Sequence, residues 1–229
     1  MSGEVRPSNT GRLMTGTAWV VLLLALWLWG KDVTEDGLGP AAGDAARPAA
    51  QSGQPGRAAA STRPLPPAVA PLDGSPAPQR VTVGALDVRA VVVPRGLDAQ
   101  GAVDPPPLSE ADTVGWYAGG PAPGEAGAAL LVGHVDTEED EAVFYGLSTL
   151  ERGARVSVTR ADGTVAEFTV EDVEQVERDA FDPERVYGER HAGRAELRLI
   201  TCGGTFDREE RRYSANVVVS AYLTGGGSA

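Results

Sequence analysis

Alternation of hydrophobic and polar residues with a period of two dominates the second half of this chain. Several segments show this pattern, or a short apolar run bounded by turn residues, and each has the length of a β-strand. The predicted strands are residues 86–93, 128–132, 155–159, 165–170, 195–201 and 216–223. Successive side chains of a strand point to opposite faces, so the pattern predicts a sheet with one face toward a core.

Helical patterns are few and short. Residues 109–116 open with a possible N-cap at Ser109, residues 143–150 have a helical apolar spacing, and residues 182–187 place Pro183 in a first helical turn. Many short strands with glycine-containing turns and few helices indicate a mainly β protein. We therefore predict a closed or nearly closed β-barrel with short helical insertions.

An apolar run lies close to the N-terminus. Residues 13–30 contain no charged side chain, and this length is near the lower limit of about 17–25 residues for a membrane-spanning helix. Arg6 and Arg12 precede the run and a mostly acidic segment follows it. The positive-inside rule then predicts a single-pass anchor in the cell membrane, with residues 1–12 cytoplasmic and the rest of the chain extracellular. A cleaved signal peptide is the alternative, since small residues at 41–46 offer a cleavage site, but the run is longer than a usual signal core.

Residues 31–80 have a different composition, with nine prolines, many Ala, Gly and Ser, and no aromatic residue. Such a segment cannot bury enough apolar surface to offset its ordering entropy, so we expect a disordered linker. Residues 81–224 are long enough for one domain with its own core, and residues 225–229 are expected to form a flexible C-terminus.

The folded domain carries nearly all of the charge imbalance. The chain has a net charge of −12, and the residues before 81 sum to +1, so residues 81–229 carry −13. An acidic surface repels the phosphate backbone, which argues against nucleic acid as a partner.

Cys202 is the only cysteine of the chain. Exported proteins normally use cysteines in pairs, so a single thiol there is either a buried apolar residue or a nucleophile. Cys202 follows the predicted strand 195–201 and precedes two glycines. A strand end that opens into a loop is a position where a thiol can meet a substrate.

Two histidines are present, and one of them lies at the end of an apolar strand. His134 follows the predicted strand 128–132 and can act as a general acid and base near neutral pH, although a hydrogen-bonded surface histidine is the simpler interpretation of this position alone. His191 lies in a Gly-rich loop and is interpreted as a solvated turn residue. Asp136 could orient the imidazole or bind an amine, but acidic turn residues are usually only solvated.

Three arginines follow Cys202 and precede the last predicted strand, namely Arg208, Arg211 and Arg212. A guanidinium there could bind an anionic intermediate or a substrate carbonyl, and ordinary surface charge is the alternative. The acidic run at 137–141 lacks the ligand spacing of a calcium loop, and the chain has no phosphate loop or zinc pattern, so we expect no metal and no cofactor. Trp116 and Tyr117 are predicted to pack beneath the histidine strand.

Together these segments resemble actinobacterial sortases, most closely those of class F, with class E as the nearest alternative. The resemblance covers residues 81–223 behind an anchor and a Pro/Ala-rich linker. It is carried by Gly133-His134, residues 142–150 (AVFYGLSTL), residues 197–202 (LRLITC) and residues 216–219 (NVVV), with residues 101–105 and 114–117 ahead of the histidine strand.

The resemblance implies an eight-stranded β-barrel and a membrane-anchored cysteine transpeptidase. Cys202 matches the nucleophile that attacks a Thr–Gly-type carbonyl in an LPxTG-like C-terminal sorting signal and forms a thioacyl enzyme. His134 matches the residue that protonates the leaving amine and deprotonates the incoming one. The implied partners are the sorting-signal peptide of surface proteins and an amine acceptor, either a peptidoglycan precursor or a pilin lysine. A thiolate–imidazolium pair and a neutral pair both remain open.

The third expected residue is an arginine that binds the substrate carbonyl or the oxyanion. Related sequences often have Tyr-Arg-Asp-Asn before the final valines, whereas this chain has Tyr213-Ser-Ala-Asn216. Arg212 shares strand parity with Ser214 and is therefore our first choice, followed by Arg211 and Arg208.

Two other functions compete with transpeptidation. An exported cysteine hydrolase would use the same Cys202 and His134 but transfer the acyl group to water. A non-catalytic cell-surface binding module would keep Cys202 only as a buried apolar residue, and its thiol would be unreactive.

Overall fold

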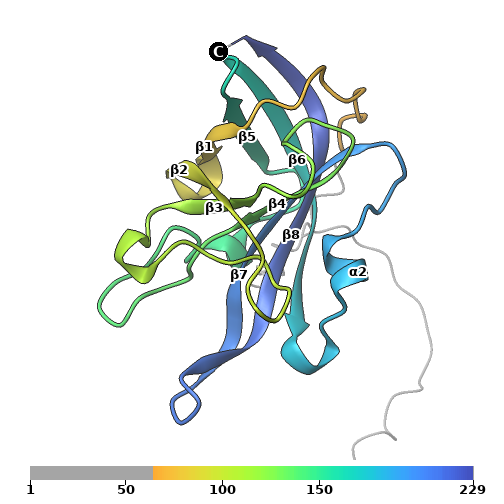
Figure 1. Cartoon of the computed structure of the whole chain (residues 1–229). Coiled ribbons are helices and arrows are strands. Elements are labelled where there is room, and N and C mark those ends of the chain that lie inside the picture. Colours follow the sequence, from red (N-terminus) through yellow and green to blue (C-terminus); the bar gives the residue numbers. More distant parts are fainter. Residues whose placement is uncertain (1–63, 229) are drawn as a thin grey trace, which may run out of the picture. The chain divides into compact units, whose positions relative to one another are not determined.

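Eight β-strands form the folded part of the chain (Figure 1). The structure is a computed structural model and describes residues 64–228. The strands are β1 (Pro78–Val83), β2 (Val88–Arg95), β3 (Val114–Tyr117), β4 (Gly127–Val132), β5 (Arg155–Arg160), β6 (Thr164–Glu177), β7 (Ala195–Asp207) and β8 (Arg212–Ser228). One short α-helix, α2 (Pro183–Tyr187), and four 3₁₀ turns, η2 (Gly84–Leu86), η3 (Leu108–Glu110), η4 (Leu147–Thr149) and η5 (Arg178–Ala180), complete the described residues.

The strands close into a barrel in the order β1-β2-β3-β4-β7-β8-β6-β5. Neighbouring strands are antiparallel except for β2–β3 and β4–β7, which are parallel. The predicted mainly β, eight-stranded barrel is therefore confirmed. Strands β7 and β8 run together and end in a hairpin turn, which Figure 1 shows as an arm extending from the barrel.

Two hydrophobic clusters explain why these residues form strands. Side chains such as Leu131, Phe168, Leu199 and Val219 fill the interior and are fully buried. Alternate residues of the same strands point outward, and several of them are also buried because other segments cover them. This outer cluster consists of Val103, Leu130, Val132, Val176, Val186, Ile200 and Val218. Cys202 has the same parity as Ile200, so it lies on the covered outer face of β7.

Helix α2 supplies part of that cover. Its N-cap Asp182 accepts hydrogen bonds from the backbone N–H groups of Glu184 and Arg185, at 3.0 and 3.4 Å, and Pro183 occupies the first turn. The short helix predicted at 182–187 is thus confirmed. The rest of the segment from β6 to β7 is held by the buried carboxylate of Glu196, which accepts hydrogen bonds from the backbone N–H groups of Arg190 and His191. His191 itself is exposed, as expected for a turn residue.

The other two predicted helices are wrong over most of their length. Only η3 is helical near residues 109–116, and β3 begins at Val114 because Val114 and Trp116 are buried beside β2. Within 143–150 only η4 forms, and the helical spacing instead places Phe144 and Leu147 in the core.

Both predicted boundaries of the folded domain move outward. Residues 225–228 are not a loose end, because they extend β8 and pair with residues 164–167 of β6. The predicted linker ended at residue 80, but β1 begins at Pro78, and the backbone N–H groups of Val69 and Leu72 donate to Leu223 O and Gly124 O at 3.1 and 2.8 Å. The apolar anchor predicted at 13–30 lies outside the described residues. Within residues 64–228 there is no helix of the length and hydropathy needed to cross a membrane.

The segment before β1 also supplies hydrogen-bond acceptors to a buried arginine. Arg160 is only 1 % exposed, and its Nη2 donates to the carbonyls of Asp73 and Gly74 at 3.1 and 2.8 Å. A chain that starts at Pro76 keeps β1 but loses these acceptors. Because hydrogen bonds to charged groups are worth about 1.5–3 kcal/mol each, we expect it to be about 2–4 kcal/mol less stable than a chain that starts at Pro64. Urea unfolding of the two chains measures this difference, and equal midpoints would contradict it.

Candidate active site

The end of β4 and the middle of β7 carry the two predicted catalytic residues. The predicted strand end before Cys202 is wrong, because β7 continues to Asp207 through its pairing with β8. These strands are parallel neighbours in a register that pairs Val132 with Ile200. The pairing continues beyond β4, since Gly133 N donates to Ile200 O at 3.1 Å and Thr201 Oγ1 donates to Gly133 O at 2.8 Å. The same register places the backbone of His134 beside that of Cys202. The parallel pairing of β4 and β7 therefore brings the histidine and the cysteine to the same row of the barrel.

His134 is half-buried and held at two points. Its carbonyl accepts a hydrogen bond from Phe144 N at 2.9 Å, and its Nε2 lies 2.6 Å from the carbonyl oxygen of Pro106, in the segment between β2 and β3. A carbonyl can only accept, so Nε2 carries a proton and donates it. In the neutral imidazole Nδ1 is then the free acceptor, and Nδ1 is the atom through which His134 can take up a proton.

Cys202 is half-buried at the end of the apolar part of β7, opposite Asn216 of β8. The next residue must be small, because a Cβ on Gly203 would lie 2.6 Å from Cγ2 of Val217. Burial raises the pKa of the Cys202 thiol, the charge and a hydrogen bond of Arg178 oppose this rise in pKa, and the charge of Asp136 adds to it. The pKa of the thiol is therefore subject to opposite effects of a cation, Arg178, and an anion, Asp136, which come from different segments.

Asp136 is fixed by a tyrosine from β8. The Tyr213 hydroxyl donates a hydrogen bond to Asp136 Oδ2, and this bond to the carboxylate raises the pKa of Tyr213 to about 12. Asp136 was a candidate to orient the imidazole, but its side-chain partner in the structure is Tyr213. Its negative charge instead raises the pKa of the Cys202 thiol.

Replacement of Asp136 by asparagine is expected to lower the pKa of Cys202, because it removes a negative charge that opposes the thiolate. The rate of iodoacetamide alkylation, measured against pH on the purified full chain, should then rise at a lower pH than in the wild type. Glu138→Gln is the matched control, since Glu138 is exposed and pairs with Arg211. If the midpoint of the alkylation–pH profile stays the same or moves to higher pH in Asp136→Asn, Asp136 does not raise the pKa of Cys202.

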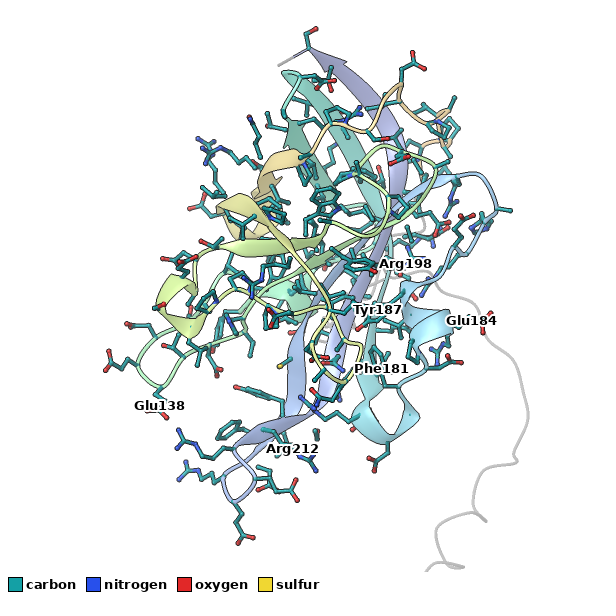
Figure 2. The ribbon with its side chains drawn as sticks, in the orientation of Figure 1. Glu138, Phe181, Glu184, Tyr187, Arg198 and Arg212 are labelled. Carbon is teal, nitrogen blue, oxygen red and sulfur yellow. The ribbon has the colours of Figure 1, made fainter. Side chains whose placement is uncertain are left out.

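The three arginines predicted after Cys202 lie toward the hairpin end of β7 and β8. Arg212 pairs with Glu210 and is placed in register with Asp207, and Figure 2 shows it near the hairpin turn. Arg211 pairs with Glu138, and Arg208 is an exposed turn residue. None of them is among the charged groups that shift the Cys202 pKa. The contacts thus do not support our first choice, Arg212, because Cys202 pairs with Asn216 of β8 whereas Arg212 pairs with Asp207.

Arg178 acts on the Cys202 thiol and was not among the arginines that the sequence analysis singled out. It is the first residue after β6, and its Nε donates to the carbonyl of Tyr213 at 2.8 Å. Arg178, Tyr213, Ser214 and Arg212 line one small polar cavity of about 200 Å³, together with Glu177, Asp179, Asp207 and Glu210. No spacing rule could have revealed Arg178, because it precedes Cys202 in the chain and approaches it only across β8.

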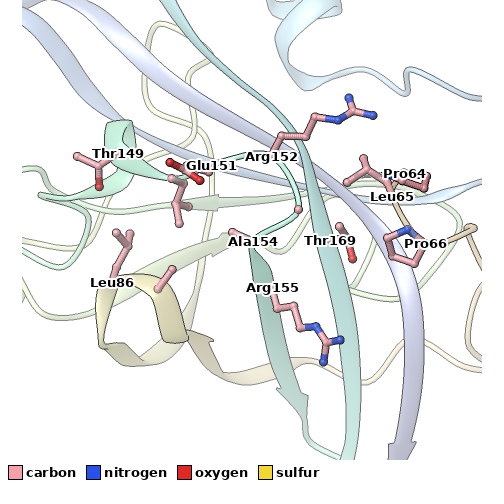
Figure 3. A pocket seen from close by; sticks show the side chains of 13 residues that line it. Pro64, Leu65, Pro66, Leu86, Thr149, Glu151, Arg152, Ala154, Arg155 and Thr169 are labelled. Atoms are coloured by element: carbon pink, nitrogen blue, oxygen red, sulfur yellow. The ribbon is translucent and has the colours of Figure 1, made fainter. Parts of the chain in front are cut away.

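A larger cavity lies elsewhere on the barrel (Figure 3). Its volume is about 710 Å³, and its lining includes Pro66, Leu86, Thr149, Arg152 and Arg155. These residues come from the surroundings of β5 and η2, and β5 is across the barrel from β4. The cavity is thus separate from Cys202 and His134. Trp116 is buried and donates from Nε1 to Pro121 O at 3.1 Å, as the predicted core position requires.

Comparison with known proteins agrees with this geometry. Residues 81–224 match the family described as Sortase domain. Sortase A from Listeria monocytogenes superposes with a TM-score of 0.50 at 15 % identity, over 68 % of this chain and 92 % of that one. Sortase A from Corynebacterium diphtheriae gives 0.50 at 15 % identity over 66 % and 62 %, and sortase C-1 from Actinomyces oris gives 0.49 at 21 % identity over 64 % and 71 %. At these identities the two sortase A structures with a TM-score of 0.50 show a shared fold. No curated protein matches the sequence.

Proposed function

Because this chain belongs to the sortase family, we propose that it is a cysteine transpeptidase that cleaves a C-terminal sorting signal and joins the new carboxyl end to an amine. The observation that supports the proposal is the parallel register of β4 and β7, which pairs Val132 with Ile200 two residues before His134 and Cys202. A nucleophile and an acid–base group in reach of each other are the minimum requirement for acyl transfer through a covalent intermediate.

In the first half of the proposed reaction, Cys202 Sγ attacks the carbonyl carbon of a Thr–Gly-type peptide bond. The C–N bond breaks, the thioester forms, and His134 gives its proton to the leaving glycine amine. In the second half an incoming amine attacks the thioester, His134 takes its proton, and the thiol leaves. The new amide replaces the one that was cleaved, so no cofactor or energy source enters the balance.

The protonation state of the free enzyme follows from the burial of the thiol. Burial raises the pKa of Cys202 above its usual range, so the thiol predominates near neutral pH. This favours a neutral Cys202–His134 pair, in which the proton moves to His134 as the sulfur attacks. The alternative, a standing thiolate–imidazolium pair, would need a lowered thiol pKa.

We assign the chain to class F, with class E as the alternative, on the segments around Gly133-His134 and residues 197–202. We also propose that residues 13–30 anchor it in the cell membrane with the tail inside and the barrel outside, because the charges flank that run in the positive-inside sense. The acceptor would then be an amine of the cell wall, a peptidoglycan precursor, or the lysine of a pilin.

The competing functions differ in what happens to the thioester. A hydrolase releases a free acid, and a binding module forms no thioester. The test incubates the purified full chain with peptides of the form Leu-Pro-X-Thr-Gly, in which X is each residue in turn, with and without triglycine. Mass spectrometry should find peptide–triglycine adduct in excess of free acid. Free acid alone would favour the hydrolase, and an uncleaved set with an unreactive thiol would favour the binding module.

A further inference from the structure

The strand register leaves a specific position for a cation beside Cys202. Cys202 pairs with Asn216 of β8, and Asn216 pairs with Val176 of β6, so these three residues form one row across three strands. Arg178 lies two residues beyond Val176, on the side of the row toward the hairpin. Two strand spacings separate β6 from β7 by about 10 Å, which the side chains of an arginine and a cysteine can together bridge.

Little stands between Arg178 and the thiol on β8. Ser214 and Asn216 are the β8 residues of matching parity, and both have short side chains. The Ser214 hydroxyl is turned toward β7, where it accepts a hydrogen bond from Thr205 N at 3.0 Å. The arginine side chain can therefore cross this strand without displacing a bulky residue.

The guanidinium is positioned by the backbone of β8 and has no acidic partner. Its Nε–H donates to Tyr213 O at 2.8 Å, and within residues 64–228 no carboxylate forms an ion pair with Arg178. No carboxylate therefore neutralises its charge, and the residue is exposed. The arginines of the hairpin differ in this respect, since Arg211 and Arg212 are paired with glutamates.

We propose that Arg178, at the end of β6, is the catalytic residue that binds the oxygen of the carbonyl attacked by Cys202. This inference rests on the proposed transpeptidase function. The charge that develops on this oxygen during attack is stabilised by fixed donors, and a guanidinium offers two parallel N–H groups. The role of an arginine is retained in this chain, but a different strand supplies it.

The surroundings of Cys202 agree with this placement. The charged and titratable groups that act on the thiol are Arg178 from the end of β6 and Asp136 from the segment after β4, and Tyr213 of β8 contacts both. His134 is adjacent through the register of β4 and β7. Arg178 opposes the rise in the pKa of Cys202 that burial causes, so its removal should raise that pKa further.

The experiment compares Arg178→Gln and Arg178→Lys with Arg212→Gln, the alternative candidate from the hairpin, and with the control Arg185→Gln, all in the full chain. Transpeptidation of the best Leu-Pro-X-Thr-Gly peptide to triglycine should fall about 10²–10³-fold in kcat for Arg178→Gln, the usual loss when one oxyanion donor is removed. Arg178→Lys should recover only part of it, because an ammonium lacks the two-pronged geometry. Arg212→Gln should lose less activity than Arg178→Gln, because Arg212 pairs with Glu210 and is not among the groups that act on the thiol. Arg185→Gln should stay within about threefold of the wild type, since Arg185 is an exposed residue of α2 that pairs with Glu174.

Alkylation of Cys202 by iodoacetamide against pH supplies a readout that needs no substrate. The Arg178→Gln profile should move to higher pH and the Arg212→Gln profile should not. A wild-type profile in Arg178→Gln, or a large loss of kcat in Arg212→Gln alone, would overturn the proposal. If Arg178→Gln shifts the profile but the wild type transfers none of the peptides, the transpeptidase function fails while the position of Arg178 beside the thiol stands.

Discussion

Replacement of Cys202 by alanine is expected to lower peptide cleavage by about 10⁴-fold or more, since removal of the nucleophile of a covalent mechanism leaves only binding and oxyanion stabilisation. Cys202 is the only cysteine, so no other thiol can substitute for it. Cleavage of the preferred Leu-Pro-X-Thr-Gly peptide, followed by chromatography, measures the effect.

The folding control for this variant is straightforward. Cys202 is only half-buried, at the point where β7 leaves the barrel, so the Cys202→Ala chain should unfold at a temperature close to that of the wild type. A folded Cys202→Ala chain that still cleaves the peptide would eliminate the covalent mechanism.

Replacement of His134 by glutamine is expected to lower kcat by about 10²–10⁴-fold, the usual contribution of a general acid and base. Glutamine is suitable here because its side-chain N–H₂ can still donate to the Pro106 carbonyl, which accepts from His134 Nε2 at 2.6 Å. The variant therefore keeps this contact to the segment before β3 and loses only the ability to exchange a proton. Single-turnover measurements with and without triglycine should show both acylation and transfer slowed.

His191→Gln provides the matched control. His191 is exposed in the loop before β7, and its Nδ1 lies 3.5 Å from Glu196 Oε1. Its replacement should therefore leave kcat within about twofold of the wild type. Equal activities of the two histidine variants would show that His134 is only a structural residue.

Local patterns in the sequence predicted a mainly β barrel and six of its eight strands. The leucines Leu197 and Leu199 alternate with polar residues and lie in the core, and such alternation is a property of neighbouring positions. The end of this strand was wrong, because β7 continues past Cys202 through its pairing with β8. The same local reasoning failed at Val114, because its pairing with Val92 in a parallel strand depends on a residue distant in the chain.

The choice of an arginine partner for Cys202 shows most clearly what could not be predicted from one sequence. Arg212 was chosen by strand parity and closeness in sequence to Cys202, but the hairpin carries it away from the thiol toward Glu210. Arg178 is near Cys202 only because β6, β8 and β7 are neighbours in the closed barrel. A contact that crosses an intervening strand leaves no spacing signal in one sequence. The hydrogen bond between His134 and Pro106 escaped prediction for the same reason.

The central claim is a thioacyl intermediate at Cys202. Its most direct test is the intact mass of the full chain after incubation with the intact substrate peptide in the absence of an amine. The account predicts a mass increase equal to the peptide portion ending in threonine, located on Cys202 by peptide mapping and removed when triglycine is added with formation of the adduct. A chain that cleaves the peptide without acquiring this mass, or that carries it on another residue, would contradict a thioacyl intermediate at Cys202.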